Sequence, residues 1–194
     1  NGCALHAGRA PNFDAAAVAL LREAGAVVLG KTVTAELAYY TPGKTRNPHD
    51  PKRTPGGSSS GSAAAVAAGM VPLALGTQTN GSTIRPASFC GIYGYKPSHG
   101  LMSRRGCLRL SRTLDHVGVF ARSIDDIALI GETLMRFDDA PAGDDEDMRP
   151  AAPPPLRRVA AAAPPVEPKL ALVKPPVWGE LAAAVRSALD AHEP

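Results

Sequence analysis

Residues Thr54–Gly100 read TPGGSSSGSAAAVAAGMVPLALGTQTNGSTIRPASFCGIYGYKPSHG, and this stretch decides the fold. It opens on a Gly/Ser turn at 56–62, which leads into a small-residue helical run at 63–68. An apolar strand-like piece at 71–76 follows, and a second Gly/Ser turn occupies 77–82. Because consecutive elements usually lie side by side, the sequence predicts that the helix and strand fold back and bring the two hydroxyl-bearing turns together.

Helical and strand-like segments alternate on both sides of this stretch. Asp14–Ala24 is amphipathic and stops at a glycine, and Ala26–Leu29 is a continuous apolar run typical of a buried strand. Ser123 opens a capping box that begins a helix reaching about Arg136. We also expect helices over 32–40 and 85–92, and strands over 93–96 and 117–121. This alternation predicts an α/β domain.

The composition divides the chain into three parts. Residues 1–137 can form one core. Residues 138–168 are first acidic and then rich in Ala and Pro, which predicts an extended linker because such a segment buries little apolar surface. Residues 169–194 are predicted to begin a further βα unit, with a strand at 170–173 and a helix at 179–191.

Charge and cysteine content narrow the function classes. The 194 residues carry a formal net charge of +3, which is too small to indicate a nucleic-acid partner. The three cysteines form no CxxC pair, which favours a reducing compartment and hence a cytoplasmic protein. No segment reaches the ~18 apolar residues of a membrane span. A basic cluster without interleaved aromatic residues is interpreted as a solvated loop or partner surface: Arg104, Arg105, Arg109 and Arg112.

Three short motifs occur in unfavourable contexts. Gly25–Thr32 matches the P-loop pattern GxxxxGK[ST], but its variable residues form the predicted strand itself, so Lys31 is interpreted as structural. Gly57–Gly61 matches the nucleophile-elbow pattern GxSxG with Ser59 in the nucleophile position, yet no strand is predicted before it. Asn80-Gly81-Ser82 matches a glycosylation acceptor, which we interpret as chance.

The Gly/Ser turn at 56–62 differs from a flexible linker because it runs directly into an apolar helix. A fixed loop at a helix N-terminus offers backbone N–H donors that have no partner inside the helix. Such donors favour sites where negative charge develops, as in the transition state of acyl transfer.

On these residues the chain resembles the amidase signature family. The likeness is densest in TRNPHDPKRTPGGSSSGSAAAVAAG (45–69), PLALGTQTNGSTIRPASFCG (72–91) and GYKPSHG (94–100). It extends to GAVVLGKT (25–32) and LDHVGVFARSIDDIALI (114–130). The resemblance implies an α/β fold with a mixed sheet and helices on both faces, incomplete in this chain.

The resemblance also implies hydrolysis of an amide bond through an acyl-enzyme formed by a Ser–cis-Ser–Lys triad. By position, Ser82 is the nucleophile, and Ser58 is the serine after a cis peptide bond that relays its proton. The implied oxyanion hole consists of the backbone N–H groups of Thr79, Asn80, Gly81 and Ser82. The implied supporting residues are Gly57, Ser59 and Ser60. The family usually has glycine at position 80, and Asn is the non-glycine residue that best tolerates a positive φ.

The base lysine of the family lies upstream of the helix that matches 14–24, and this chain begins after that point. Lys31 matches a different family position. We therefore expect a signature core truncated at both ends, with the base lysine not present in the chain and with impaired amidase activity. The resemblance implies a small-molecule amide substrate and no metal or cofactor. It allows a homo-oligomer, and no nucleic-acid or membrane partner is expected.

Two alternatives to a simple amidase stay open. One is an amidotransferase subunit of the same family, which uses the released ammonia and works with partner subunits. The other is a catalytically inactive fragment or assembly module.

Overall fold

The structure is a computed structural model that describes residues 1–135, 155–164, 166–167, 169 and 176–191. The chain forms two compact units, residues 1–161 and 162–194. The elements of the first unit are η1 (Ala4–His6), α1 (Ala16–Glu23), η2 (Glu36–Ala38), α2 (Ser60–Ala67), β1 (Leu73–Gln78), α3 (Ile84–Phe89), β2 (Tyr93–Tyr95), β3 (His116–Ala121), α4 (Ile124–Leu134) and α5 (Leu156–Ala161). The second unit contains η4 (Pro176–Glu180) and α6 (Ala183–Asp190).

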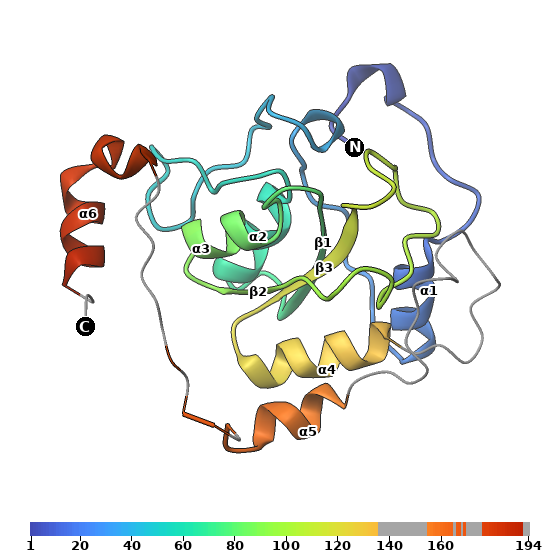
Figure 1. Cartoon of the computed structure of the whole chain (residues 1–194). Coiled ribbons are helices and arrows are strands. Elements are labelled where there is room, and N and C mark those ends of the chain that lie inside the picture. Colours follow the sequence, from blue (N-terminus) through green and yellow to red (C-terminus); the bar gives the residue numbers. More distant parts are fainter. Residues whose placement is uncertain (136–154, 165, 168, 170–175, 192–194) are drawn as a thin grey trace. The chain divides into compact units, whose positions relative to one another are not determined.

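A three-stranded antiparallel sheet forms the centre of the first unit, with the strand order β1-β3-β2 (Figure 1). The central strand β3 pairs with β1 over its full length, so that Leu73 lies opposite Ala121 and Gln78 opposite His116. The short strand β2 pairs with the other edge of β3, with Tyr93 opposite Ala121. The predicted strands at 93–96 and 117–121 are confirmed, and the one predicted at 71–76 lies at 73–78.

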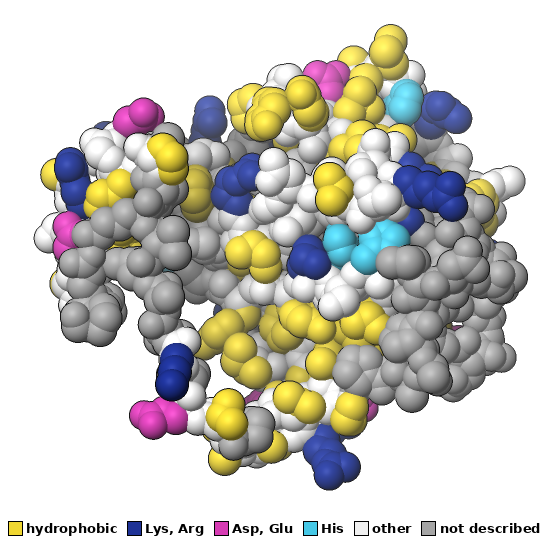
Figure 2. Space-filling model, viewed as in Figure 1, with side chains coloured by type: hydrophobic (Ala, Val, Ile, Leu, Met, Phe, Trp, Pro, Cys, Tyr) yellow, Lys and Arg dark blue, Asp and Glu magenta, His cyan; other side chains and the backbone are white. Residues whose placement is uncertain are grey.

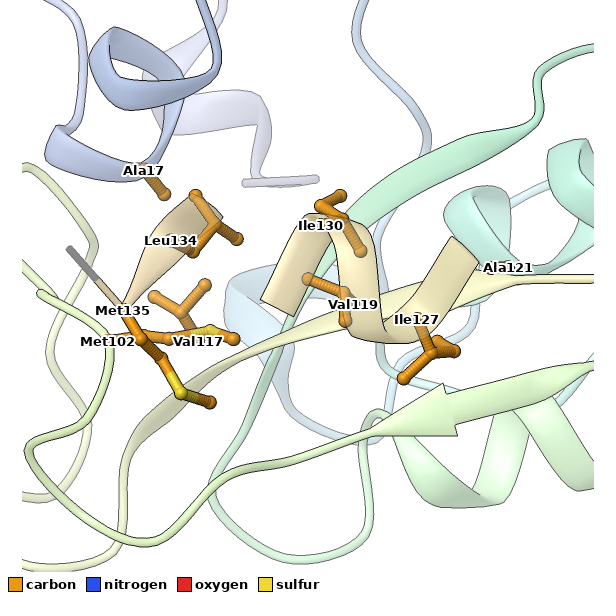
Figure 3. Close-up of a cluster of buried hydrophobic side chains, with 9 residues drawn as sticks. All are labelled: Ala17, Met102, Val117, Val119, Ala121, Ile127, Ile130, Leu134 and Met135. Carbon is orange, nitrogen blue, oxygen red and sulfur yellow. The ribbon is translucent and has the colours of Figure 1, made fainter. Parts of the chain in front are cut away.

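The central strand contributes to a separate core on each face of the sheet, because successive side chains of a strand point to opposite faces. Val117, Val119 and Ala121 pack in the cluster that includes α4 and Ala17 of α1 (Figure 3). Phe120 packs on the other face against α2 and α3, with Ala63, Val66, Ala87 and Cys90. Helices thus cover both faces of the sheet, as the α/β prediction stated, whereas both described strand pairs are antiparallel and not mixed.

Glycines in β1 and β3 let the α2 and α3 side approach the sheet closely. A Cβ on Gly76 would lie 2.6 Å from the Phe120 ring and 2.9 Å from Ser59 Oγ. A Cβ on Gly118 would lie 2.6 Å from Thr83 Oγ1. Only glycine fits at these two positions. The turns that contain Ser59 and Thr83 therefore lie directly on the sheet.

Helix α4 begins where the capping box predicted. Ser123 Oγ accepts a hydrogen bond from Asp126 N at 3.1 Å. The buried face of the helix carries Ile127, Ile130 and Leu134, which pack on β3 (Figure 3). Burial of each such side chain stabilises the fold by about 1.5–3 kcal/mol, so this helix is a main anchor of the sheet.

The apolar run at 26–29 is not a buried strand, and that prediction is wrong. Val27, Val28 and Leu29 are 82%, 53% and 73% exposed, and the run pairs with none of the described strands. An extended segment becomes a strand only when a neighbour satisfies its N–H and C=O groups. The helix predicted over 32–40 is also wrong, because this segment forms only the three-residue η2, where Leu37 has a φ of 51°.

Part of the predicted linker at 138–168 is helical. Leu156 at the start of α5 packs against the α4 cluster, and Arg157 N donates a hydrogen bond to Glu132 Oε2 at 2.9 Å. The strand predicted at 170–173 lies outside the described residues. The helix predicted at 179–191 corresponds to the end of η4 followed by α6.

Within the described ranges, no helix combines the length and the apolar character of a membrane-crossing segment. Apolar side chains lie between polar and basic ones over the face shown in Figure 2. Exposed apolar side chains of this kind are ordinary in folded proteins.

Candidate active site

The two Gly/Ser turns that were predicted to meet do lie together. Ser59 N donates a hydrogen bond to Ser82 O at 3.2 Å. The Arg85 guanidinium bridges the turns, with Nη1 donating to Gly57 O at 3.2 Å and Nη2 to Asn80 O at 2.7 Å. These three bonds fix the end of one turn against the end of the other.

A pocket of about 400 Å³, which includes space open to solvent, lies beside the two turns. Ser58 and Ser82 both line it, as does Thr79. Its other lining residues come mainly from β1, the start of β3 and the loop between β2 and β3: Ala38, Thr77, Gln78, Arg104, Cys107, Leu108, Arg109, Leu110, Asp115, His116 and Val117. The candidate nucleophile and the candidate relay serine thus share one pocket.

Ser58 is 2% exposed, and the peptide bond that joins it to Gly57 is cis. Its carbonyl accepts hydrogen bonds from Ala35 N at 3.0 Å and from Thr34 Oγ1 at 2.9 Å. Its Oγ is buried and makes no hydrogen bond to any described residue. A buried polar atom without a partner is rare in native proteins, and a catalytic role is one of the few reasons for it.

The other serines of this turn bond to the scaffold. Ser59 Oγ donates to Thr77 O at 3.1 Å and accepts from Thr77 N at 3.2 Å. Ser60 Oγ donates to a backbone carbonyl at 3.3 Å, and Ser62 Oγ shares a 2.7 Å hydrogen bond with Thr32 Oγ1. None of the three is among the residues that line the pocket. The hydroxyl of Ser59 faces the sheet, which argues against the nucleophile-elbow interpretation.

The second turn carries backbone donors beside Ser82, which is 8% exposed. The amide N–H groups of Asn80, Gly81 and Ser82 donate no hydrogen bond to the described part of the chain. The next two, at 83 and 84, both donate to Gln78 Oε1, at 2.9 and 3.1 Å. The positive φ of this turn, 82°, belongs to Gly81 rather than to Asn80, so an asparagine at position 80 fits without strain.

Asp115 lines the pocket and was not predicted as a site residue. Its Oδ1 accepts a hydrogen bond from Thr79 Oγ1, and its Oδ2 accepts from Leu110 N at 2.7 Å and Ser111 N at 2.9 Å. Burial would raise the pKa of Asp115, but these hydrogen bonds and the positive charge of Arg104 together hold it below its ordinary value. Asp115 is therefore a carboxylate at neutral pH.

Arg104 corrects the interpretation of the basic cluster as solvent-exposed. It is 6% exposed, and Nη1 donates to the carbonyls of Ser111, Arg112 and Asp115 at 3.3, 2.9 and 3.2 Å. Arg105, Arg109 and Arg112 are exposed. Sequence reasoning missed the burial of Arg104, because the backbone carbonyls to which it donates leave no mark on residue types.

His116 also lines the pocket. Burial lowers its pKa, and the charges of Lys96 and His99 act in the same direction, against the carbonyls of Leu114 and Gln78. The ring is therefore neutral at pH 7. Its Nδ1 lies 2.6 Å from Leu114 O, so this nitrogen carries the proton.

The P-loop interpretation of Gly25–Thr32 finds no support in the structure. A phosphate loop follows a strand and opens a helix, but here helix α1 precedes Gly25–Thr32 and the next element is the short η2. Lys31 is exposed. In the part of the chain that the structure describes, no group of three or more His, Cys, Asp or Glu side chains is placed to hold a metal ion.

Known proteins are similar to this chain in sequence and in fold. The A subunit of the glutamyl-tRNA(Gln) amidotransferase of Treponema pallidum strain Nichols is 55% identical over 127 residues, 62% of this chain and 25% of that protein. The native peptide amidase of Stenotrophomonas maltophilia is 40% identical with a TM-score of 0.65, over 72% of this chain and 30% of that one. A vestigial protein complex linked to the origins of an s-triazine catabolic enzyme gives 40% identity and a TM-score of 0.70, over 81% and 35%.

The chain thus spans about a quarter to a third of the length of these relatives. The sequence model of the Amidase family matches residues 1–192, which is nearly the whole chain. Together with the fold shared with solved amidases, this match shows that the chain belongs to the amidase family.

Proposed function

We propose that this chain carries the acyl-transfer centre of an amide-cleaving enzyme, with Ser82 as the nucleophile and Ser58 as the proton relay. The observation that supports it most is the buried, unpartnered hydroxyl of Ser58 in the pocket that Ser82 also lines. A relay hydroxyl accepts a proton on one side and donates one on the other, so it cannot be committed to the scaffold. The other serines of the turn are committed in that way.

In this mechanism Ser82 Oγ forms a bond to the carbonyl carbon of the amide, and its proton passes through Ser58 to the base. The C–N bond then breaks as the leaving nitrogen takes up a proton, and water releases the acyl group from Ser82. The amide N–H groups at 80–82 would stabilise the negative charge on the carbonyl oxygen, because they donate to no described residue.

The base in this mechanism is a lysine, as the family resemblance implies. No lysine is among the described residues that line the pocket. His116 also lines the pocket, but among the described residues it forms no hydrogen bond with Ser58 or Ser82, so it is not placed to take the proton from either hydroxyl. We therefore expect the 194-residue chain, assayed by itself, to cleave amides far more slowly than a full-length relative such as the peptide amidase of Stenotrophomonas maltophilia.

A fluorophosphonate probe tests the nucleophile. The protein expressed from the complete reading frame and the 194-residue chain are treated in parallel, and the labelled peptide is located by mass spectrometry. We expect the label on Ser82, and we expect Ser82→Ala to lose turnover by at least about 10³-fold. A label on Ser59, or full activity in Ser82→Ala, would show that the assignment is wrong.

A second candidate, an amidotransferase component, is favoured by one comparison. The amidotransferase A subunit of Treponema pallidum is 55% identical to this chain over 127 residues. Such a component passes the released ammonia to an acceptor and works within a complex. Ammonia release from glutamine that rises severalfold on addition of the partner proteins supports this candidate. Partner-independent hydrolysis of simple aryl amides supports the amidase.

A further inference from the structure

The buried carboxylate of Asp115 contacts the turn at 79–82, which carries the candidate nucleophile Ser82. Asp115 precedes β3, is 9% exposed, and its two side-chain oxygens reach different segments. Oδ1 accepts from the hydroxyl of Thr79, the first residue of the turn 79–82. Oδ2 accepts from the backbone of Leu110 and Ser111, in the loop that forms one wall of the pocket.

Arg104, which belongs to the same loop between β2 and β3, also holds this segment. Its guanidinium donates to the carbonyls of Ser111, Arg112 and Asp115, so the cation holds carbonyls while the carboxylate holds N–H groups. Asp115 connects this loop to the turn at 79–82 through the hydrogen bond that Thr79 Oγ1 donates to it. Each oxygen of Asp115 serves only as an acceptor, which suits an ionised carboxylate and not an amide or a protonated acid.

We propose that Asp115 is a positioning residue, which acts through the Thr79 hydroxyl to hold the turn 79–82 at a fixed distance from the pocket wall at 108–111. The inference rests on the proposed function, because it treats this turn as the one that carries the nucleophile and the oxyanion donors. Small displacements of reacting groups lower rates strongly. The hydrogen bond therefore acts on the chemical step and hardly on substrate affinity.

Thr79→Val tests this with little change in shape, because it removes the hydroxyl and leaves the backbone N–H in place. In the protein from the complete reading frame, we expect kcat to fall by about 10- to 100-fold with KM within about threefold of wild type. The rate of fluorophosphonate labelling at Ser82 should fall in parallel. Thr79→Ser restores the hydroxyl and should recover most of the rate. The exposed Thr113 supplies the matched control, and Thr113→Val should leave both constants unchanged.

A double-mutant cycle with Asp115→Asn identifies the partner. If the hydroxyl acts through Asp115, Thr79→Val should lower kcat by less than about twofold in the Asp115→Asn background. Multiplicative losses, or a Thr79→Val protein with wild-type kcat and a native circular dichroism spectrum, would overturn the inference. Ser82→Ala separates this from the proposed function: if Ser82→Ala stays active, the proposed function fails. If Ser82→Ala is inactive and Thr79→Val is normal, only the positioning role fails.

Discussion

The pocket side and the scaffold side of one Gly/Ser turn differ in a way that residue type does not show. Ser58 on the pocket side is buried with an unpartnered hydroxyl, whereas Ser59, Ser60 and Ser62 on the scaffold side each bond to a neighbouring segment. All four are buried to a similar degree. Within this turn, hydrogen-bond commitment, and not burial, separates the candidate catalytic hydroxyl from the structural ones.

The largest expected effect is on the pocket side. Ser58→Ala should lower the rate of amide hydrolysis by about 10²–10⁴-fold, the usual contribution of a positioned proton-transfer group. The same change should leave the free energy of unfolding unchanged or slightly higher, because it removes a buried hydroxyl without a partner. Ammonia release and urea unfolding of the same preparation measure both. A clear loss of stability together with normal activity would reverse the roles that we assign to the two sides.

Ser59→Ala should show the opposite pattern. It removes both hydrogen bonds to the Thr77 backbone, and we expect the free energy of unfolding to fall by about 1–3 kcal/mol. Activity per folded molecule should fall much less than in Ser58→Ala. Urea unfolding followed by circular dichroism, with kcat measured below the transition, makes the comparison. Equal rate losses in the two variants would remove the distinction between the sides.

The hydrogen-bonded carboxylate of Asp115 makes the free energy of unfolding depend on pH. Its pKa is lowered in the folded state, so the carboxylate contributes its full stabilisation at pH values above the unfolded pKa of about 3.9. That contribution is lost as the pH falls through the lower folded value. Asp115→Asn should therefore be less stable than wild type at pH 7, with a difference that shrinks in acid, as thermal unfolding from pH 7 to pH 2 would show.

Asp14→Asn is the matched control for this measurement, because Asp14 forms an exposed ion pair with Arg22. Removing such a pair should cost less than about 1 kcal/mol at neutral pH. If the two variants lost the same amount of stability at pH 7, the buried hydrogen bonds of Asp115 would contribute no more stability than the exposed ion pair of Asp14.

The smallest expected effect concerns the outer edge of the scaffold side. Ser62→Ala removes one hydroxyl–hydroxyl bond to Thr32, which should cost about 0.5–1.5 kcal/mol. Thr32→Val should cost a similar amount, and the double variant little more than either, because both remove the same bond. Additive losses in chemical denaturation would show that the hydroxyls act separately.

Local signals in the sequence were reliable where one segment decides its own structure. The Ser123 capping box placed the start of α4, since the cap and its acceptor lie within one turn of helix. The apolar strand at 117–121 was also predicted, because both of its faces are buried. The similar run at 26–29 failed because a strand depends on a partner that its own residues cannot specify.

The sequence by itself determined the order of elements between residues 60 and 134, the two Gly/Ser turns, and the family to which Ser58 and Ser82 point. Only the tertiary structure decided which hydroxyls bond to the scaffold, and that Asp115 and Arg104 stand behind the site. The physical reason is that helix caps and turns arise from neighbours in the chain. Contacts such as that between Thr79 and Asp115 join residues 36 positions apart, and exist only once the sheet has formed.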